Sequence, residues 1–267
     1  MTIDRKGYIE EIFAGSQLAM AIGETQSVPL ANPTVANKLT TYVKDFANSV
    51  EVSKDFFDDN LHGVWGKIVS DFALKARRTQ DSEAFGWFRG AFTTSLTADG
   101  SAFCSAHTLI GAGTETNFAS GAGSALSGAS INTGIVALTQ QKDQAGVVMG
   151  NTPAIMLVPP ALFKKAKEET DSALYADNAN NAINVYRSAY GFVVYQSPYL
   201  GSAAGGSDTA WFLLARNHSV TRLIRQGITT ALRDWTMSNN RTYLYQYNFR
   251  EAVYAPDYCG AWGSVGV

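Results

Sequence analysis

The chain has 267 residues, enough for one large domain or two modest ones. Apolar residues make up 46% of it and only 16% are charged, against roughly 25% in an average soluble domain. This bias is typical of buried interface cores, so we expect extensive self-association, with a weakly charged monomer as the alternative. The formal net charge of −2 shows no basic excess and argues against dedicated nucleic-acid recognition.

Targeting and redox signals are sparse. The two cysteines, Cys104 and Cys259, form no disulfide framework and no zinc-type spacing. The first residues contain no apolar run of signal-peptide length. The most apolar later stretch, Ala154–Phe163, is interrupted by two prolines and is too short to span a membrane. We therefore expect a soluble chain made in a reducing cytoplasm, with no membrane partner.

The N-terminal region reads as an arm followed by a long loop. Residues 1–14 carry a short apolar stripe at helical spacing, too short to stand alone; its members are Tyr8, Ile9, Ile12 and Phe13. Residues 15–40 lack a helical period and contain several glycines and prolines. We predict an extended loop or long hairpin, with its tip near residues 27–33. Loops of this length usually reach outward or are functional.

A strand and two helices are expected next. Lys38–Val52 interleaves apolar and polar residues and predicts a strand. Lys54–Arg78 predicts a long helix with Ser53 as its N-cap. A second helix is predicted over Ser82–Thr94.

The middle of the chain gives the clearest mixed α and β signal. A turn-rich stretch, Asp99–Gly128, precedes a helix predicted over Ser130–Gln141. Ala154–Val158 is a short continuous apolar run, as expected of a buried strand. Pro160 then starts a helix to about Ser172.

Three further strands complete the prediction, at Gly191–Gln196, Ala210–Ala215 and Thr242–Val253. The last alternates sharply, and four aromatic residues share one face; they are Tyr243, Tyr245, Tyr247 and Phe249. The strand before the long helix and the C-terminal strands are expected to pair around that helix. The middle of the chain would then be an inserted second unit.

The search for catalytic motifs returns nothing specific. No phosphate-binding loop and no nucleophile elbow is present, and glycine-rich Gly121–Gly128 lacks the strand and helix of a dinucleotide site. A hydrolase using His107 or His218 stays open as a minor alternative. Cys104 and His107 form a CxxH, better explained by a buried thiol and a hydrogen-bonded histidine than by zinc. We expect no catalytic residue, cofactor or metal site.

Charged groups have ordinary explanations. The carboxylate pairs Asp58–Asp59 and Glu168–Glu169 suit a helix start and a solvated helix face. A late set of arginines could face packaged DNA or carboxylates at subunit contacts, although scattered surface is slightly favoured; the set is Arg216, Arg222, Arg225 and Arg233.

Several stretches, in their order and spacing, resemble the major capsid proteins of tailed bacteriophages. These proteins have the Hong Kong 97-type α+β fold, and the likeness is closest to the Mu-like major head subunit branch. The stretches run from about residue 38: KLTTYVKDFANSVEVSKDFFDDN at Lys38–Asn60, DGSAFCSAH at Asp99–His107 followed by Asn117 and Leu126-Ser127, PAIMLVPP at Pro153–Pro160, SPYL at Ser197–Leu200 with WFLL at Trp211–Leu214, and DYCGAWGS at Asp257–Ser264.

The resemblance implies a set of named parts. They are an N-terminal arm (1–14), an extended loop (15–41) lying over a neighbouring subunit, a peripheral domain with a long spine helix (42–98 and 226–267) and an axial domain (99–225). It implies hexamers and pentamers of an icosahedral shell that encloses double-stranded DNA without sequence-specific binding. A portal protein is an implied partner, and the implied location is the virion capsid, assembled in the host cytoplasm. An encapsulin-like nanocompartment shell is the alternative within this fold.

Two departures from relatives of this type lead to further expectations. No helical scaffolding region precedes the arm, so a separate scaffolding protein or none is implied, and decoration proteins are possible partners. The predicted loop tip, Thr25–Thr34, contains no lysine, so we expect no covalent cross-links between loops. Apolar residues of the arm and loop are the expected subunit-interface residues; they are Ile9, Phe13, Leu18, Met20, Ile22, Val28 and Leu30.

Overall fold

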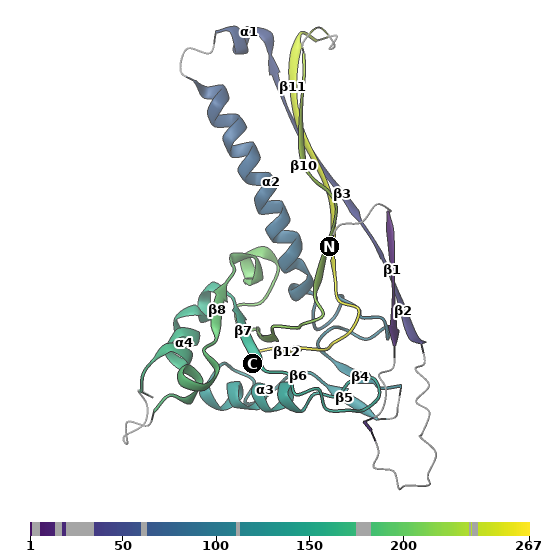
Figure 1. Cartoon of the computed structure of the whole chain (residues 1–267). Helices are drawn as coiled ribbons and strands as arrows, with labels where there is room; N and C mark the ends of the chain where they lie inside the picture. The colour runs from purple at the N-terminus through teal and green to yellow at the C-terminus, as the bar shows by residue number, and fades with distance from the viewer. Residues whose placement is uncertain are drawn as a thin grey trace. The chain divides into compact units, whose positions relative to one another are not determined.

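The computed structural model describes residues 1, 6–13, 18–19, 35–59, 63–110, 113–174, 183–234, 236 and 240–267. These residues form a mixture of helices and strands (Figure 1) and fall into two compact units. Unit 1 consists of Met1–Tyr8, Thr40–Ala84 and Thr221–Tyr254, whereas unit 2 consists of Ile9–Leu39, Phe85–Val220 and Ala255–Val267. No helix in the described ranges is long and apolar enough to cross a bilayer.

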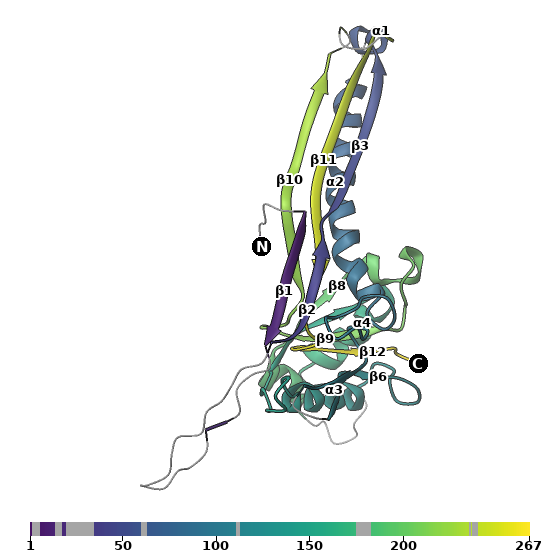
Figure 2. The same cartoon turned by 90° about the vertical axis from the view of Figure 1, so that its right-hand side faces the viewer.

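Unit 1 is built on a three-stranded antiparallel sheet in the order β10-β11-β3 (Figure 2). The strands are β3 (Lys44–Ser53), β10 (Thr221–Arg233) and β11 (Thr242–Tyr254). The predicted pairing of the strand before the long helix with a C-terminal strand is confirmed. β10 was not predicted, because bulges between Ile224 and Gln226 and between Gln226 and Thr229 interrupt its alternation.

An aromatic face of β11 packs against α2 (Val64–Arg89), whose residues up to Ala84 belong to unit 1. Phe72 of α2 lies 4.6 Å from the ring of Tyr247, and Phe249 stacks on Phe46 of β3 at 4.9 Å. The shared face predicted for the alternating aromatic residues is therefore confirmed. Aromatic pairs in such tilted and stacked geometries stabilise a core beyond the area that they bury.

The predicted helix boundaries were wrong on both sides of α2. The expected single helix from Lys54 is two helices, α1 (Lys54–Asp58) and α2, and α2 runs on to Arg89 instead of ending at Arg78. Gly63 takes a left-handed φ of +62°, which a continuous helix cannot contain. No breaker stands between Arg78 and Ser82, so the two predicted helices are one. Ser53 is the predicted N-cap: its side chain accepts a hydrogen bond from the Phe56 amide at 3.2 Å.

The structure also corrects the prediction for the N-terminal segment. Residues 1–14 were expected to carry a helical stripe, but β1 (Gly7–Phe13) is a strand paired with β2 (Val35–Tyr42). Exposure alternates along β1, and Glu11 forms an ion pair with Lys38 of β2 at 2.7 Å. Cross-strand pairing thus decides the conformation of a segment too short to hold a helix. The predicted loop tip at residues 27–33 lies outside the described residues.

Unit 2 contains a five-stranded mixed sheet in the order β6-β12-β9-β7-β8. Its strands are β6 (Phe118–Ala119), β7 (Pro153–Val158), β8 (Val193–Gln196), β9 (Trp211–Ala215) and β12 (Ala261–Ser264). The other elements are β4 (Ala106–Thr108), β5 (Thr114–Thr116), α3 (Gly128–Gln140), α4 (Pro160–Asp171), a π-helix at Tyr186–Tyr190 and 3₁₀ turns at Pro198–Leu200 and Ser202–Ala204. The middle helices and buried strands predicted from sequence are confirmed.

Both faces of this sheet are buried along its inner strand β9. Along β9, Trp211 and Leu213 join one core cluster, whereas Phe212 and Leu214 join another. A strand covered on both sides needs apolar residues at every position, which explains the continuous run in the sequence. On one face Gly134 of α3 lies so close to Leu213 and Trp262 that a Cβ would meet their side chains at 2.8 and 2.9 Å.

Candidate assembly surfaces

A buried hydrogen-bond network holds the DGSAFCSAH stretch within unit 2. His107 of β4 is fully buried, and its Nδ1 lies 2.8 Å from Oδ2 of Asp99. Its Nε2 lies 3.3 Å from the carbonyl oxygen of Phe103, and its ring stacks on Tyr258 at 4.5 Å. Both ring nitrogens are therefore engaged by the fold, and the predicted hydrogen-bonded histidine is confirmed.

Asn117 ties the same stretch to the C-terminal strand. Its Oδ1 accepts a hydrogen bond from the Ser105 amide at 2.9 Å, and its Nδ2 donates to the carbonyls of Phe103 and Ala261 at 2.8 and 3.3 Å. Asn117 is buried, so each of these bonds replaces one that water would make. Asn117 therefore links the DGSAFCSAH stretch to β12 by hydrogen bonds.

The charge state of Asp99 follows from its neighbours. Partial burial acts to raise the pKa of Asp99, but hydrogen bonds from His107, Thr97 and the Ser101 amide outweigh it and lower the pKa to about 2. Asp99 therefore stays ionised well into the acid range.

The histidine and cysteine alternatives lose their support. His107 offers no free ring nitrogen to activate a nucleophile. Burial lowers the pKa of His218, and its Nδ1 has no hydrogen-bond partner in the described part of the chain, so no carboxylate orients that ring through this atom. Cys104 is buried and burial raises the pKa of its thiol, which keeps it protonated and inert.

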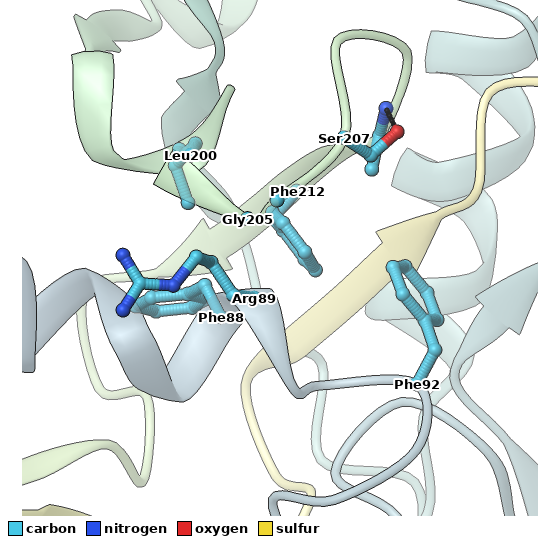
Figure 3. Close-up of a pocket in the computed structure, with 9 residues that line it drawn as sticks. Phe88, Arg89, Phe92, Leu200, Gly205, Ser207 and Phe212 are labelled. Atoms are coloured by element: carbon cyan, nitrogen blue, oxygen red, sulfur yellow. Dashed lines mark hydrogen bonds between the residues drawn. The ribbon is translucent and has the colours of Figure 1, made fainter. Parts of the chain in front are cut away.

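A small hollow of about 140 Å³ lies in unit 2 beside the end of α2 (Figure 3). Three of its nine lining residues are aromatic, and Phe212 of β9 lies between Phe88 and Phe92. Among the described residues that line it, Arg89 is the one with an ionisable side chain, and its guanidinium donates to the Tyr199 carbonyl at 3.1 Å. Without an acid–base pair, this hollow offers packing space and no acid–base chemistry.

The late arginines do not form one site. Arg216 follows β9 in unit 2, whereas the other three lie on β10 in unit 1. Arg222 pairs with buried Glu251, and Arg225 and Arg233 form no ion pair among the described residues. The two carboxylate pairs take part in ion pairs within their own helices. Asp58 pairs with Lys54, and Oε1 of Glu168 lies 3.6 Å from Nζ of Lys164.

Exposed apolar side chains are the outstanding surface feature. Of the expected interface residues, Ile9, Phe13 and Leu18 are 61%, 59% and 73% exposed. Met20, Ile22, Val28 and Leu30 lie outside the described residues. Sequence reasoning missed Val193 and Tyr195 of the edge strand β8, half exposed on alternate positions around buried Val194. Their alternation within an apolar run was the available signal.

Comparison with known proteins identifies the family. A family model described as "Phage capsid protein" matches residues 36–262. No curated protein matches.

Solved structures are similar in fold. The capsid of a native GTA particle has a TM-score of 0.63 and 12% identity over 98% of this chain and 85% of that chain. The capsid of Myoviridae phage XM1 has a TM-score of 0.58 and 13% identity over 98% of this chain and 86% of that chain. A virus-like particle from Pyrococcus furiosus has a TM-score of 0.58 and 8% identity over 99% of this chain and 88% of that chain.

These similarities agree with the mixed sheet, the long helix and the absence of a catalytic constellation in the described residues. The fold is the Hong Kong 97-type α+β fold of tailed-phage capsids, as expected from the sequence. The chain belongs to the phage capsid protein family and is a structural, non-enzymatic component of a virion shell.

Proposed function

We propose that this major capsid protein forms the hexamers and pentamers of an icosahedral shell that encloses double-stranded DNA. The observation that carries this proposal is the exposure of the apolar side chains of Ile9, Phe13 and Leu18. Leaving such side chains in water is costly, and covering them on adjacent copies contributes roughly 25 cal/mol per Å² buried. Each contact can be weak because a closed shell repeats it in many copies.

The named parts expected from sequence remain our proposal for how the shell is built. Residues 1–14 act as the arm, 15–41 as the loop over a neighbour, 42–98 and 226–267 as the peripheral domain, and 99–225 as the axial domain. The assignment of residues 85–98 and 255–267 to the peripheral domain needs a direct test, because both ranges pack within unit 2. We also place the chain in the Mu-like head subunit branch, on the Asp99, His107 and Asn117 pattern.

Deleting residues 18–33 tests the role of the loop. The variant is expected to fold, with wild-type circular dichroism, yet to form no shells in electron micrographs, because the surface that covers a neighbour is missing. A length-matched control keeps the loop but replaces Leu18, Met20, Ile22, Val28 and Leu30 by serine, and it should fail in the same way. Normal particles from either variant would contradict the proposed role.

The choice between a phage head and an encapsulin-like compartment rests on the contents. Both shells share this fold, so the fold does not separate them. Native particles of a phage head are expected to contain nuclease-resistant double-stranded DNA, whereas particles holding only protein cargo would favour the compartment. Assembly in the host cytoplasm and contacts with a portal, a scaffolding protein or decoration proteins complete the proposal.

A further inference from the structure

The two edges of the unit 1 sheet carry opposite charge. β10, one edge strand, contains three arginines and no acidic residue. β3, the other edge strand, leads directly into α1, and residues 44–59 contain five acidic residues and two lysines. β10 and β3 lie on opposite sides of β11 (Figure 2), so the sheet has a basic edge at β10 and an acidic edge at β3 together with α1 and Asp59.

The backbone of the basic edge can both donate and accept hydrogen bonds from an added strand. Beside its first half, the Met1 ammonium donates to the Arg222 carbonyl at 3.0 Å, and the Ile224 amide donates to the Met1 carbonyl at 2.8 Å. Past the two bulges, Thr229–Arg233 pairs regularly with β11. In this second half every residue is exposed, Leu232 at 56%, and no other described strand pairs with it.

Two charged side chains on each edge form no ion pair among the described residues. Arg225 and Arg233 form no ion pair within the described ranges, unlike Arg222, which is bound by Glu251. On the acidic edge Glu51 and Asp59 also form no ion pair there, although Glu51 accepts a hydrogen bond from Thr242. Each edge thus offers two charges whose complements lie on the opposite edge of the same sheet.

We propose that the basic edge of one copy pairs with the acidic edge of a second copy, so that β10 lies beside β3 of its neighbour. This inference rests on the proposed function and names one of its contact surfaces. Two different edges meet, so the contact is head-to-tail, and successive contacts of this kind close into a ring when the rotation between copies allows it. Strand addition supplies main-chain hydrogen bonds, while the charges select the partner edge and disfavour two like edges meeting.

Charge reversal tests the pairing. R225E/R233E makes both edges acidic, and E51K/D59K makes both edges basic. Each double variant is expected to fold but to lose at least about tenfold in shell yield at physiological salt, as like charges face each other. Combining all four substitutions restores opposite edges and should restore assembly. K164E/K165E, on the exposed face of α4, applies the same charge change elsewhere and should leave assembly unaltered.

Backbone pairing has its own readout in amide hydrogen exchange. On assembly of the wild-type protein, exchange should slow in both Thr229–Arg233 and Lys44–Ser53. Unchanged exchange in these strands, or assembly by R225E/R233E equal to wild type, would overturn the edge pairing. Wild-type protein that forms no shells at all would instead overturn the proposed function, so the two failures are distinguishable.

Discussion

Asp99 carries a stability contribution that depends on pH. Its pKa in the folded chain is about 2, against about 3.9 in an unfolded chain. A lowered pKa favours folding above the unfolded value, and the contribution disappears as the pH falls through the folded value. The contribution near neutral pH is about 2–3 kcal/mol.

We therefore predict that Asp99→Asn lowers the free energy of unfolding at pH 7 and matters much less near pH 2, where about half of Asp99 is already protonated. Urea unfolding of both proteins at the two pH values measures the difference. An equal difference in the free energy of unfolding at pH 7 and pH 2 would show that the ionised carboxylate of Asp99 does not stabilise the fold.

Sequence reasoning found the residues of this network but not their purpose. Asp99, His107 and Asn117 stood out by resemblance, and a bonded histidine was expected. That Asn117 reaches Ala261 could not be predicted, because this contact joins residues 144 positions apart. Similarly, the partner that stacks on His107 is Tyr258, which no local pattern indicates.

At the scale of elements, alanine substitutions at two helical glycines are predicted to have opposite effects on stability. A Cβ at Gly134 would meet Leu213 and Trp262 side chains closer than real Cβ contacts allow, whereas a Cβ at Gly66 has nothing within 4 Å. Gly134→Ala should destabilise by about 1–3 kcal/mol through overpacking. Gly66→Ala should stabilise by about 0.5–1 kcal/mol through helix propensity. Thermal unfolding of both variants measures the pair, and a stabilised Gly134→Ala would contradict the tight contact.

Element existence was predictable where the pattern was strong. The apolar runs at Ala154–Val158 and Ala210–Ala215 are buried on both faces and were found. The boundaries around α2 were not, because they depend on the backbone at Gly63 and on the turn after Arg89, where three amides converge on the Gly90 carbonyl. β12 was missed because four residues that include a glycine carry too little period to detect.

At the scale of the whole molecule, we predict shells without covalent links between subunits. An amide cross-link needs a lysine amine on the loop, and Thr25–Thr34 has none. Lys38 lies in β2 and is held in an ion pair with Glu11. Particles boiled in detergent should run as a single monomer band of 28.7 kDa on a gel. A ladder of multiples would show that another amine reaches a neighbour.

The position of β12 in the unit 2 sheet has a consequence for synthesis on the ribosome. β12 lies between β6 and β9, so this sheet cannot close before residues 261–264 have been translated. Such late, non-local pairing delays the folding of unit 2 until β12 has been made. A nascent or prematurely terminated copy would lack the strand that joins the two sides of the sheet.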